Sequence, residues 1–266
     1  MVWSVPCLSG AERMDSGERC RLDQTMVERG LADSRSRARA LIEAGLVTID
    51  GVAADKPSRM VAAAADVALT GLDHPWVSRG GVKLVHALDR FAIDVAGRVA
   101  LDIGASTGGF TDVLLARGAA KVYAVDVGHD QLAAKLRADP RVVVLERVNA
   151  RYLTADEVPE LVSLLVSDAS FIGLEVLLPA ALDRAAPGAD LVALIKPQFE
   201  VGPGLVGKGG VVKDPALHRA TCQRISDWLD AQQGWRVLGL VESPIRGPDG
   251  NVEFLIHARR TEGEPV

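Results

Sequence analysis

The chain has 266 residues, of which 48% are hydrophobic and 24% charged, and its formal net charge is −5. This composition is typical of a folded globular protein and excludes a chain that is disordered throughout. Asp168 and Glu175 interrupt the longest apolar stretch, which therefore lacks the roughly 20 apolar residues of a transmembrane helix.

Residues 1–18 read as a loose extension, and they lack the charged and apolar regions of a secretory signal. A basic segment follows, because eight Lys or Arg stand against six Asp or Glu between Arg19 and Met60. Leu22, Met26 and Val27 have helical spacing, and Gly30 is placed to end this first helix.

A second helix is predicted to begin after Ser34, a candidate N-cap. Its apolar stripe of Ala38, Leu41 and Ile42 is bordered by basic residues. The sequence "LVTIDGVAAD" then alternates apolar and polar residues around Asp50-Gly51, which predicts a hairpin with a two-residue turn.

Two short helices, a hairpin and arginines beside the second helix resemble the S4 RNA-binding module, over about residues 19–72. The alternative for these charges is a solvated helix face. The candidate RNA-binding residues here are Arg35, Arg37, Arg39, Lys56 and Arg59.

Residues 73–79 read as a linker, since Pro75 restricts His74 to extended geometry and Gly80-Gly81 precede a new helix. A second domain is expected over residues 80–260, followed by a tail over 261–266. Its strand candidates alternate with helical segments, which is typical of a doubly wound α/β sheet. In order they are "RVALDIG", "KVYAVDV", "RVVVLER", "SLLVSDAS", "LVALIKP", "GWRVLGLVES" and "VEFLIHAR".

The last two strands are joined by a loop too short for a helical crossover, so they are expected to pair antiparallel. Seven strands that end in such a hairpin fit the Rossmann-like domain of methyltransferases that use S-adenosylmethionine. The fold class is therefore α/β, with a small S4-like domain before the methyltransferase domain.

A glycine-rich turn follows the first strand of this domain in "LDIGASTGGFTD". Its pattern, Asp102-x-Gly104-x-x-x-Gly108-Gly109, departs from the G-x-G-x-x-G of dinucleotide folds. Glycines allow close approach of the backbone to a ligand, and Asp126 ends the next strand, where a carboxylate accepts hydrogen bonds from ribose hydroxyls. We expect S-adenosylmethionine here, with NAD or purely structural glycines as alternatives. Asn149 is either an adenine contact or a turn residue.

Four further residues suggest the chemistry of the site. Asp168 and Lys196 end the fourth and fifth strands, and Glu253 begins the last, antiparallel strand. The carboxyl ends of parallel strands form the ligand crevice of such sheets, so these residues are expected to meet there. With Lys83, at the start of the domain's first helix, they match the Lys-Asp-Lys-Glu set of ribose 2'-O-methyltransferases, although each alone is also compatible with a solvated charge.

These motifs, with "VSRGGVKL", "SDASFI", "IKPQFE", "KGGVVKD" and "SPIRGPDGNVEFL", resemble the TlyA (haemolysin A-like) family of ribosomal RNA 2'-O-methyltransferases over about residues 19–260. The resemblance implies methylation of cytidine in 16S and/or 23S ribosomal RNA, and a link to capreomycin sensitivity. It implies that Lys83, Asp168, Lys196 and Glu253 are catalytic. The implied cofactor residues are Asp102, Gly104, Ala105, Ser106, Gly108, Gly109, Asp126, Asn149 and Asp168.

Two versions of the chemistry stay open at this level. Lys196 is either a neutral base for the ribose hydroxyl or an ammonium that stabilises the developing alkoxide. Lys208 and Lys213, in a glycine-rich loop, are candidate phosphate contacts or ordinary surface lysines. The alternative functions are a membrane-active haemolysin and an RNA-binding protein without catalysis.

The three cysteines, Cys7, Cys20 and Cys222, are scattered and lack the spacing of a metal or disulfide framework. We expect reduced thiols, no metal and a cytoplasmic location. The expected partner is ribosomal RNA within ribosomal subunits, with no membrane partner, and the expected state is a monomer. The length of the N-terminal extension makes Met14 an alternative translation start.

Overall fold

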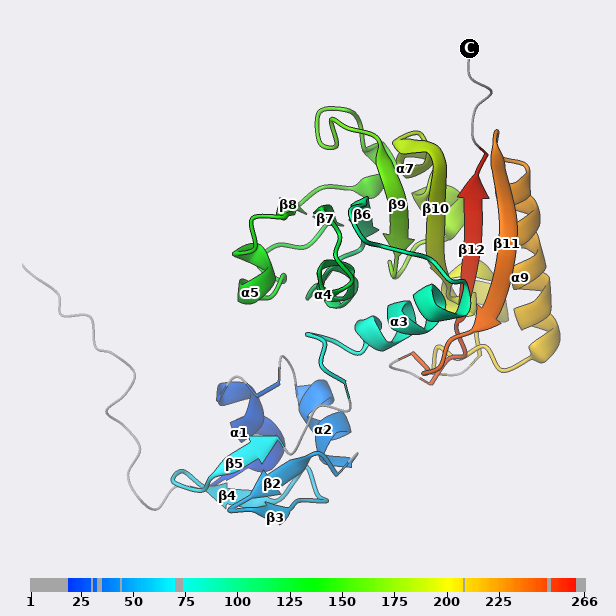
Figure 1. Cartoon of the computed structure of the whole chain (residues 1–266). Helices are drawn as coiled ribbons and strands as arrows, with labels where there is room; N and C mark the ends of the chain where they lie inside the picture. Colours follow the sequence, from blue (N-terminus) through cyan, green and yellow to red (C-terminus); the bar gives the residue numbers. More distant parts are fainter. Residues whose placement is uncertain are drawn as a thin grey trace, which may run out of the picture. The chain divides into compact units, whose positions relative to one another are not determined.

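A computed structural model of the chain describes residues 19–29, 31–32, 35–43, 45–69, 74–207, 209–247 and 250–261 (Figure 1). The chain divides into two compact units, Met1–Pro75 and Trp76–Val266. Outside the described residues lie the predictions for residues 1–18, the helix end at Gly30, the N-cap at Ser34, Lys208, the tail from residue 262 and the side chain of Arg37.

The small unit has both predicted helices, α1 (Leu22–Glu28) and α2 (Arg35–Glu43). They pack through the apolar stripe expected from their spacing, because Leu22, Met26, Ala38 and Ile42 are all fully buried. Two small sheets complete the unit. In one, β1 (Arg19–Arg21) pairs with β4 (Met60–Ala62); in the other, β2 (Val47–Ile49) lies between β3 (Val52–Ala53) and β5 (Val67–Leu69).

The predicted hairpin is confirmed, because β2 and β3 pair antiparallel around Asp50 and Gly51. Both turn residues have left-handed backbone, with φ of 52° and 78°, as a type I′ turn requires. The strands β1, β4 and β5 were not predicted. Each has only three residues, too few for an alternating pattern to be distinguished in the sequence.

The large unit is built on a seven-stranded sheet in the order β11-β12-β10-β9-β6-β7-β8, which confirms the predicted fold class (Figure 1). β12 pairs antiparallel with both neighbours, and the other pairings are parallel. The strands are β6 (Val99–Ile103), β7 (Lys121–Asp126), β8 (Val142–Glu146), β9 (Val162–Ser167), β10 (Ala185–Ile195), β11 (Trp235–Glu242) and β12 (Phe254–Arg260).

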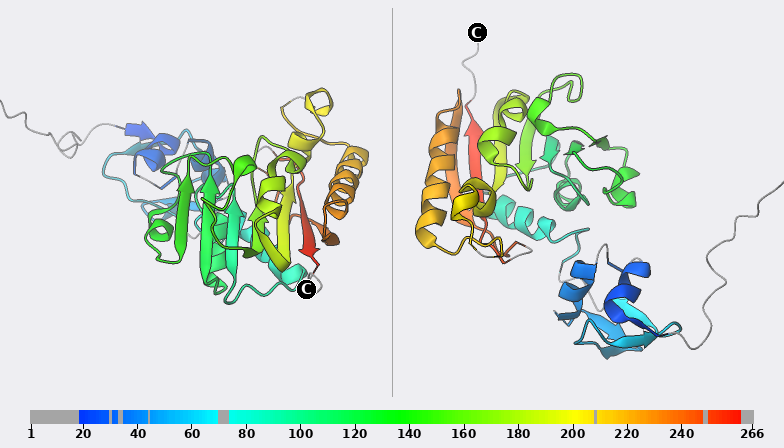
Figure 2. Two further views of the ribbon diagram at one scale, coloured as in Figure 1. Left: turned by 90° about the horizontal axis from the view of Figure 1, so that it is seen from above. Right: turned by 180° about the vertical axis from the view of Figure 1, so that it is seen from behind.

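Helices cover both faces of this sheet, as the layered views of Figure 2 show. One face packs against α3 (Gly80–Arg90), α4 (Gly109–Ala116) and α5 (Ala134–Arg137). The other packs against η1 (Ala150–Tyr152), α6 (Leu174–Leu177), α7 (Pro179–Leu182) and α9 (Pro215–Asp230). Two short helices, α8 (Pro197–Glu200) and η2 (Pro203–Leu205), follow β10. No helix within the described ranges is long and apolar enough to cross a bilayer.

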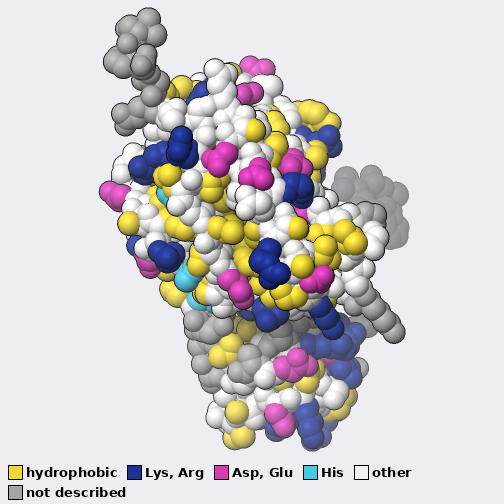
Figure 3. Space-filling model, turned by 90° about the vertical axis from the view of Figure 1, so that its right-hand side faces the viewer, with side chains coloured by type: hydrophobic (Ala, Val, Ile, Leu, Met, Phe, Trp, Pro, Cys, Tyr) yellow, Lys and Arg dark blue, Asp and Glu magenta, His cyan; other side chains and the backbone are white. Residues whose placement is uncertain are grey.

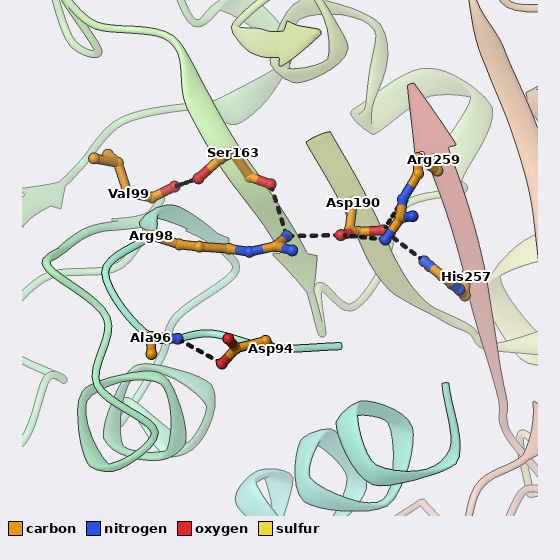
Figure 4. A network of polar contacts seen from close by, with 8 residues as sticks. All are labelled: Asp94, Ala96, Arg98, Val99, Ser163, Asp190, His257 and Arg259. Carbon is orange, nitrogen blue, oxygen red and sulfur yellow. Dashed lines mark hydrogen bonds and ion pairs between the residues drawn. The ribbon is translucent and has the colours of Figure 1, made fainter. Parts of the chain in front are cut away.

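A buried carboxylate ties the strands together away from their carboxyl ends (Figure 4). Asp190 on β10 accepts hydrogen bonds from His257 Nε2 at 2.8 Å, Arg259 Nε at 2.8 Å and Arg98 Nη1 at 2.6 Å. Burial alone would raise the pKa of Asp190, but these donors outweigh it and hold the pKa below its usual range. This network fixes β10 beside β12, the two strands that lead to Lys196 and away from Glu253.

Candidate active site

Four charged residues predicted from the sequence come together at one edge of the sheet. Lys83 lies in the first half of α3, Asp168 directly follows β9, Lys196 directly follows β10, and Glu253 directly precedes β12. Lys83 Nζ donates a hydrogen bond to Glu253 Oε2 at 2.7 Å and lies 3.6 Å from Asp168 Oδ2. Lys196 Nζ lies 2.7 Å from Asp168 Oδ1. Asp168 therefore stands between the two lysines.

The four side chains form an electrically balanced set that is largely closed to solvent. The side chains of Lys83, Lys196 and Glu253 are 7%, 8% and 2% exposed, whereas that of Asp168 is 20% exposed. Buried charges need partners of opposite sign, and each of the four has at least one here. Asp168 is thus the most accessible member of the set.

Lys196 has three acceptor atoms around its Nζ. Besides the Asp168 carboxylate, the Asp168 carbonyl oxygen and Ser170 Oγ each accept a hydrogen bond at 2.9 Å. These two hydrogen bonds engage two of the three N–H donors of an ammonium group, and the Asp168 carboxylate adds an ion pair. The sequence motif "SDASFI" contained Ser170, but nothing in its spacing identified it as a partner of Lys196.

Glycines make room for the carboxylates of this set. A Cβ at Gly247, in the loop between β11 and β12, would lie 2.6 Å from Glu253 Oε1. A Cβ at Gly80 would lie 3.3 Å from Asp168 Oδ2. The motifs "RGG" and "SPIRGPDGN" therefore contribute space for Asp168 and Glu253.

The glycine-rich turn connects β6 to α4 beside the charged set. Gly104 has a left-handed φ of 80°, and a Cβ there would lie 2.8 Å from the Cα of Ala169. The sequence argument assigned this glycine to the approach of a ligand, and the structure adds the approach of the loop that carries Asp168. Gly108, with a φ of 94°, is the N-cap of α4, and Gly109 begins that helix. The turn is thus tied directly to the catalytic candidates.

Asp126 lies at the end of β7, next to the turn. Its Oδ2 accepts a hydrogen bond from the Ser106 N–H at 2.8 Å, and its Oδ1 accepts one from the Gly128 N–H at 2.7 Å. A carboxylate offers about four acceptor positions, so acceptor capacity for a ribose diol is left on both oxygens. The half-buried Asp126 thus fits a nucleoside cofactor.

Two predicted cofactor residues, Asp102 and Ala105, are buried. Asp102 is fully buried and its Oδ2 accepts a hydrogen bond from Thr111 Oγ1 at 2.7 Å, while Ala105 is also buried. Burial raises the pKa of Asp102 to about 7. Asn149 caps η1 by accepting the Arg151 N–H at 3.1 Å, which is the turn role left open by the sequence. Direct contact of these three with a cofactor stays a prediction.

In the small unit, the buried carboxylate of Asp23 forms ion pairs with three arginines. Asp23 on α1 is fully buried, and its Oδ2 lies 2.9 Å from Arg21 Nη2 and 3.3 Å from both Arg35 Nη2 and Arg39 Nε. The Arg21 hydrogen bond is the main reason that the pKa of Asp23 falls below its usual range. The sequence predicted Arg35 and Arg39 as basic residues, but it did not indicate Asp23 or Arg21.

Lys56, Arg59 and Lys213 are the other predicted basic residues that the structure describes, and they are exposed. Lys56 and Arg59 lie in the loop between β3 and β4, whose backbone contacts the start of α1 through the Leu22 N–H and the Arg59 carbonyl at 2.8 Å. Dark-blue basic side chains gather on one side of the small unit in Figure 3. Lys213 of the large unit is exposed beside Val212, which is anchored through Asn251 Oδ1 at 3.0 Å. Within the part of the chain that the structure describes, no group of three His, Cys, Asp or Glu could hold a metal.

Comparisons with known proteins agree with both units. The FtsJ-like methyltransferase family model matches residues 76–260, and the S4 domain model matches residues 20–67. A 16S/23S rRNA (cytidine-2'-O)-methyltransferase TlyA from Mycobacterium tuberculosis is 54% identical, over 91% of this chain and 90% of that protein. Hemolysin A from Brachyspira hyodysenteriae is 41% identical over 89% of this chain and 98% of that protein.

A solved structure from Streptococcus thermophilus, classed with the hemolysins, is also similar. It has a TM-score of 0.73 and 41% sequence identity, and the match covers 91% of this chain and 89% of that one. These similarities extend over both units rather than over the sheet domain alone.

Proposed function

Because the chain belongs to the TlyA family of FtsJ-like methyltransferases, we propose that it transfers a methyl group from S-adenosylmethionine to the ribose 2'-hydroxyl of a cytidine in ribosomal RNA. The proposed substrates are 16S and/or 23S ribosomal RNA within ribosomal subunits, which places the reaction in the cytoplasm. The protein acts as a monomer and without a metal in this proposal.

The observation that carries the proposal is the convergence of Lys83, Asp168, Lys196 and Glu253 next to the glycine-rich turn. Two lysines and two carboxylates lie within 3.6 Å of their partners, and Gly104 joins the turn to the Asp168 loop. Such a set suits the activation of a hydroxyl group. A cysteine nucleophile, as used in the methylation of a base carbon, is absent from it.

Bound S-adenosylmethionine supplies an activated sulfonium methyl group. The protein then has to orient the ribose hydroxyl and compensate the charge that develops on its oxygen. Lys196 suits this role as an ammonium, because the Asp168 carbonyl oxygen and Ser170 Oγ engage two of its N–H groups and leave the third for the substrate. This third N–H stabilises the developing alkoxide, and the partly exposed Asp168 carboxylate receives the proton of the hydroxyl.

The other two members of the set hold the arrangement in place. Lys83 is hydrogen-bonded to Glu253 at 2.7 Å and lies near the second Asp168 oxygen. This fixes the direction of the Asp168 carboxylate toward Lys196. Asp126 would hold the cofactor ribose, and the turn of Gly104, Ala105, Ser106, Gly108 and Gly109 would line the cofactor site together with Asp102, Asn149 and Asp168.

The small unit supplies RNA affinity in this proposal. Arg35, Arg37, Arg39, Lys56 and Arg59 are assigned to RNA phosphates, as are Lys208 and Lys213 in the glycine-rich segment after Lys196. Phosphate contacts position a protein on RNA without reading its sequence. The choice of cytidine therefore depends on the large unit.

An alkaline ladder of the RNA product tests the proposal. Alkali cleaves RNA through attack of the 2'-oxygen on the adjacent phosphate, so a 2'-O-methyl group blocks cleavage at one linkage. Ribosomal RNA treated with enzyme and cofactor should show a gap at one cytidine per modified site. A complete ladder, with the incorporated methyl label on a base, would overturn the assignment.

A further inference from the structure

Two segments lie side by side at the catalytic edge of the sheet, and successive residues of one contact successive residues of the other. The first is the loop from Asp168 to Leu174, and the second is Lys196 with the short helix α8. Lys196 contacts Asp168 and Ser170, and the Phe199 ring lies 5.0 Å from the Phe171 ring. At the far end, Glu200 Oε1 accepts a hydrogen bond from the Leu174 N–H at 2.8 Å.

Glu200 is the buried anchor of this pairing. Its side chain is only 3% exposed, and its Oε2 accepts a hydrogen bond from Arg224 Nη2 at 2.9 Å. The same Arg224 nitrogen donates to the Glu200 carbonyl oxygen at 3.1 Å, and Arg224 also pairs with Glu175. The carboxylate thus connects the Asp168 loop to α9, the longest helix of the domain.

The loop needs such an anchor because its own backbone is unfavourable. Phe171 has a φ of 66°, in the left-handed region that bulky residues avoid. Its side chain is 89% exposed, so burial of the ring contributes little to keep this conformation. A strained backbone persists only where the surrounding structure fixes it. The residues on either side of Phe171 in the chain are held instead, because Lys196 bonds Ser170 and Glu200 bonds Leu174.

The sequence at position 173 agrees with this role. A Cβ at Gly173 would lie 3.2 Å from Glu200 Oε2, closer than most real contacts of a Cβ. The absence of a side chain there lets the carboxylate reach the Leu174 N–H. The sequence motif "IKPQFE" therefore contains Lys196 and, four residues later, Glu200, whose carboxylate holds the Asp168–Leu174 loop.

We propose that Glu200 is a positioning residue for methyl transfer, which holds the Asp168–Leu174 loop against α8 and so fixes Asp168 and Ser170 around Lys196. This inference rests on the proposed function of Lys196 and Asp168. Glu200 contacts neither of them directly, and Arg224 holds Glu200 in turn. Loss of the Glu200 contact frees the loop, and small displacements of reacting groups cost large factors in rate.

Glu200→Gln tests the proposal, with Glu175→Gln as its matched control. Both substitutions exchange a carboxylate for an amide and remove the negative charge of one Arg224 ion pair, but only Glu200 also bonds the catalytic loop. We expect Glu200→Gln to lower kcat about 10- to 100-fold, with the KM for RNA and the Kd for S-adenosylmethionine within about twofold of the wild type. Glu175→Gln should stay within about twofold for all three quantities.

Hydrogen exchange of the peptide that covers Asp168–Leu174 gives a readout independent of activity. Glu200→Gln should speed exchange in this peptide, whereas Glu175→Gln should not. Arg224→Met, which keeps Glu200 but removes its guanidinium partner, should give an intermediate rate. If the wild type transfers no methyl group, the proposed function fails while the exchange result still decides the role of Glu200 in holding the loop.

Two results would overturn the proposal. One is wild-type exchange and kcat in Glu200→Gln. The other is an equal loss of kcat, cofactor affinity and Tm in both glutamine variants, because that would show a general structural contribution of Arg224 rather than positioning of the loop.

Discussion

Lys196 Nζ is held by Asp168 through two different atoms, the carboxylate Oδ1 at 2.7 Å and the carbonyl oxygen at 2.9 Å. One residue thus fixes the lysine through its side chain and its main chain. The ammonium position consequently depends on the backbone of the loop after β9 as well as on charge.

Lys196→Met should reduce methyl transfer about 100- to 1,000-fold, the usual loss when a donor to a developing oxyanion is removed. Cofactor affinity should remain within about twofold, because the role of Lys196 lies in the transition state. Transfer of labelled methyl groups and calorimetry of S-adenosylmethionine binding measure the two effects. Near-normal turnover would remove Lys196 from the mechanism.

Asp126→Ala should weaken S-adenosylmethionine binding about 10- to 100-fold, as expected when hydrogen bonds to a charged group are lost. Part of this loss comes from the turn, because Asp126 also accepts the Ser106 and Gly128 N–H groups. Glu160→Ala is a useful control, since it removes a carboxylate just before β9 that bonds Lys121 and Tyr123 of β7 instead. Equal affinity of both variants and the wild type for the cofactor, measured by calorimetry, would contradict the assignment.

Arg39→Ala should weaken RNA binding and flatten its dependence on salt. Each lost phosphate contact lowers the slope of log K against log salt by about 0.7 for single strands and about 0.9 for duplex. Arg21 and Arg35 remain on Asp23 in this variant, so the buried carboxylate keeps partners. Arg117→Ala is the control, because Arg117 is an exposed arginine of the large unit that pairs with Asp89. An unchanged slope for Arg39→Ala would exclude a phosphate contact.

Asp102 should make the large unit less stable as the pH rises from about 4 to about 7. Burial raises its pKa from 3.8 to about 7 in the folded protein, so the folded state binds the proton more tightly than the unfolded state between these values. A difference of one in pKa corresponds to about 1.4 kcal/mol of stability. Asp102→Asn removes this dependence.

Urea unfolding of the cofactor-free wild type and Asp102→Asn between pH 5 and pH 8 measures how the free energy of unfolding of each protein depends on pH. The stability of Asp102→Asn relative to the wild type should increase up to about pH 7 and then stay constant. Parallel pH profiles for the two proteins would show that Asp102 titrates as an ordinary carboxylate.

The sequence predicted the sheet domain well because its signals are local. Asp168 and Lys196 each follow an apolar strand directly, and the rule that parallel strands end at one edge brings them together. Glu253 was placed there by the short loop before β12, which enforces an antiparallel return. These arguments need only the order and direction of strands.

The side-chain contacts that hold the charged residues in place could not be predicted from the sequence. Asp23 and Glu200 look like ordinary surface carboxylates in their motifs, yet both are buried because residues from other helices converge on them. Ser170 was hidden in the same way, since its partner Lys196 lies 26 residues later. Such pairings depend on side-chain geometry across elements, which periodicity does not describe.

The position of β12 has a consequence for how the protein is made. This strand is the last of the domain in the chain, yet it lies inside the sheet, between β10 and β11. A growing chain therefore leaves the edge of β10 unpaired until β12 has emerged, and unpaired edges of this kind invite association with other chains. Glu253 reaches Lys83, 170 residues earlier, only at that stage. A chain halted during translation before β12 thus exposes the unpaired edge of β10 and lacks Glu253. We expect such a chain to be bound by chaperones or degraded by proteases rather than to be partly active.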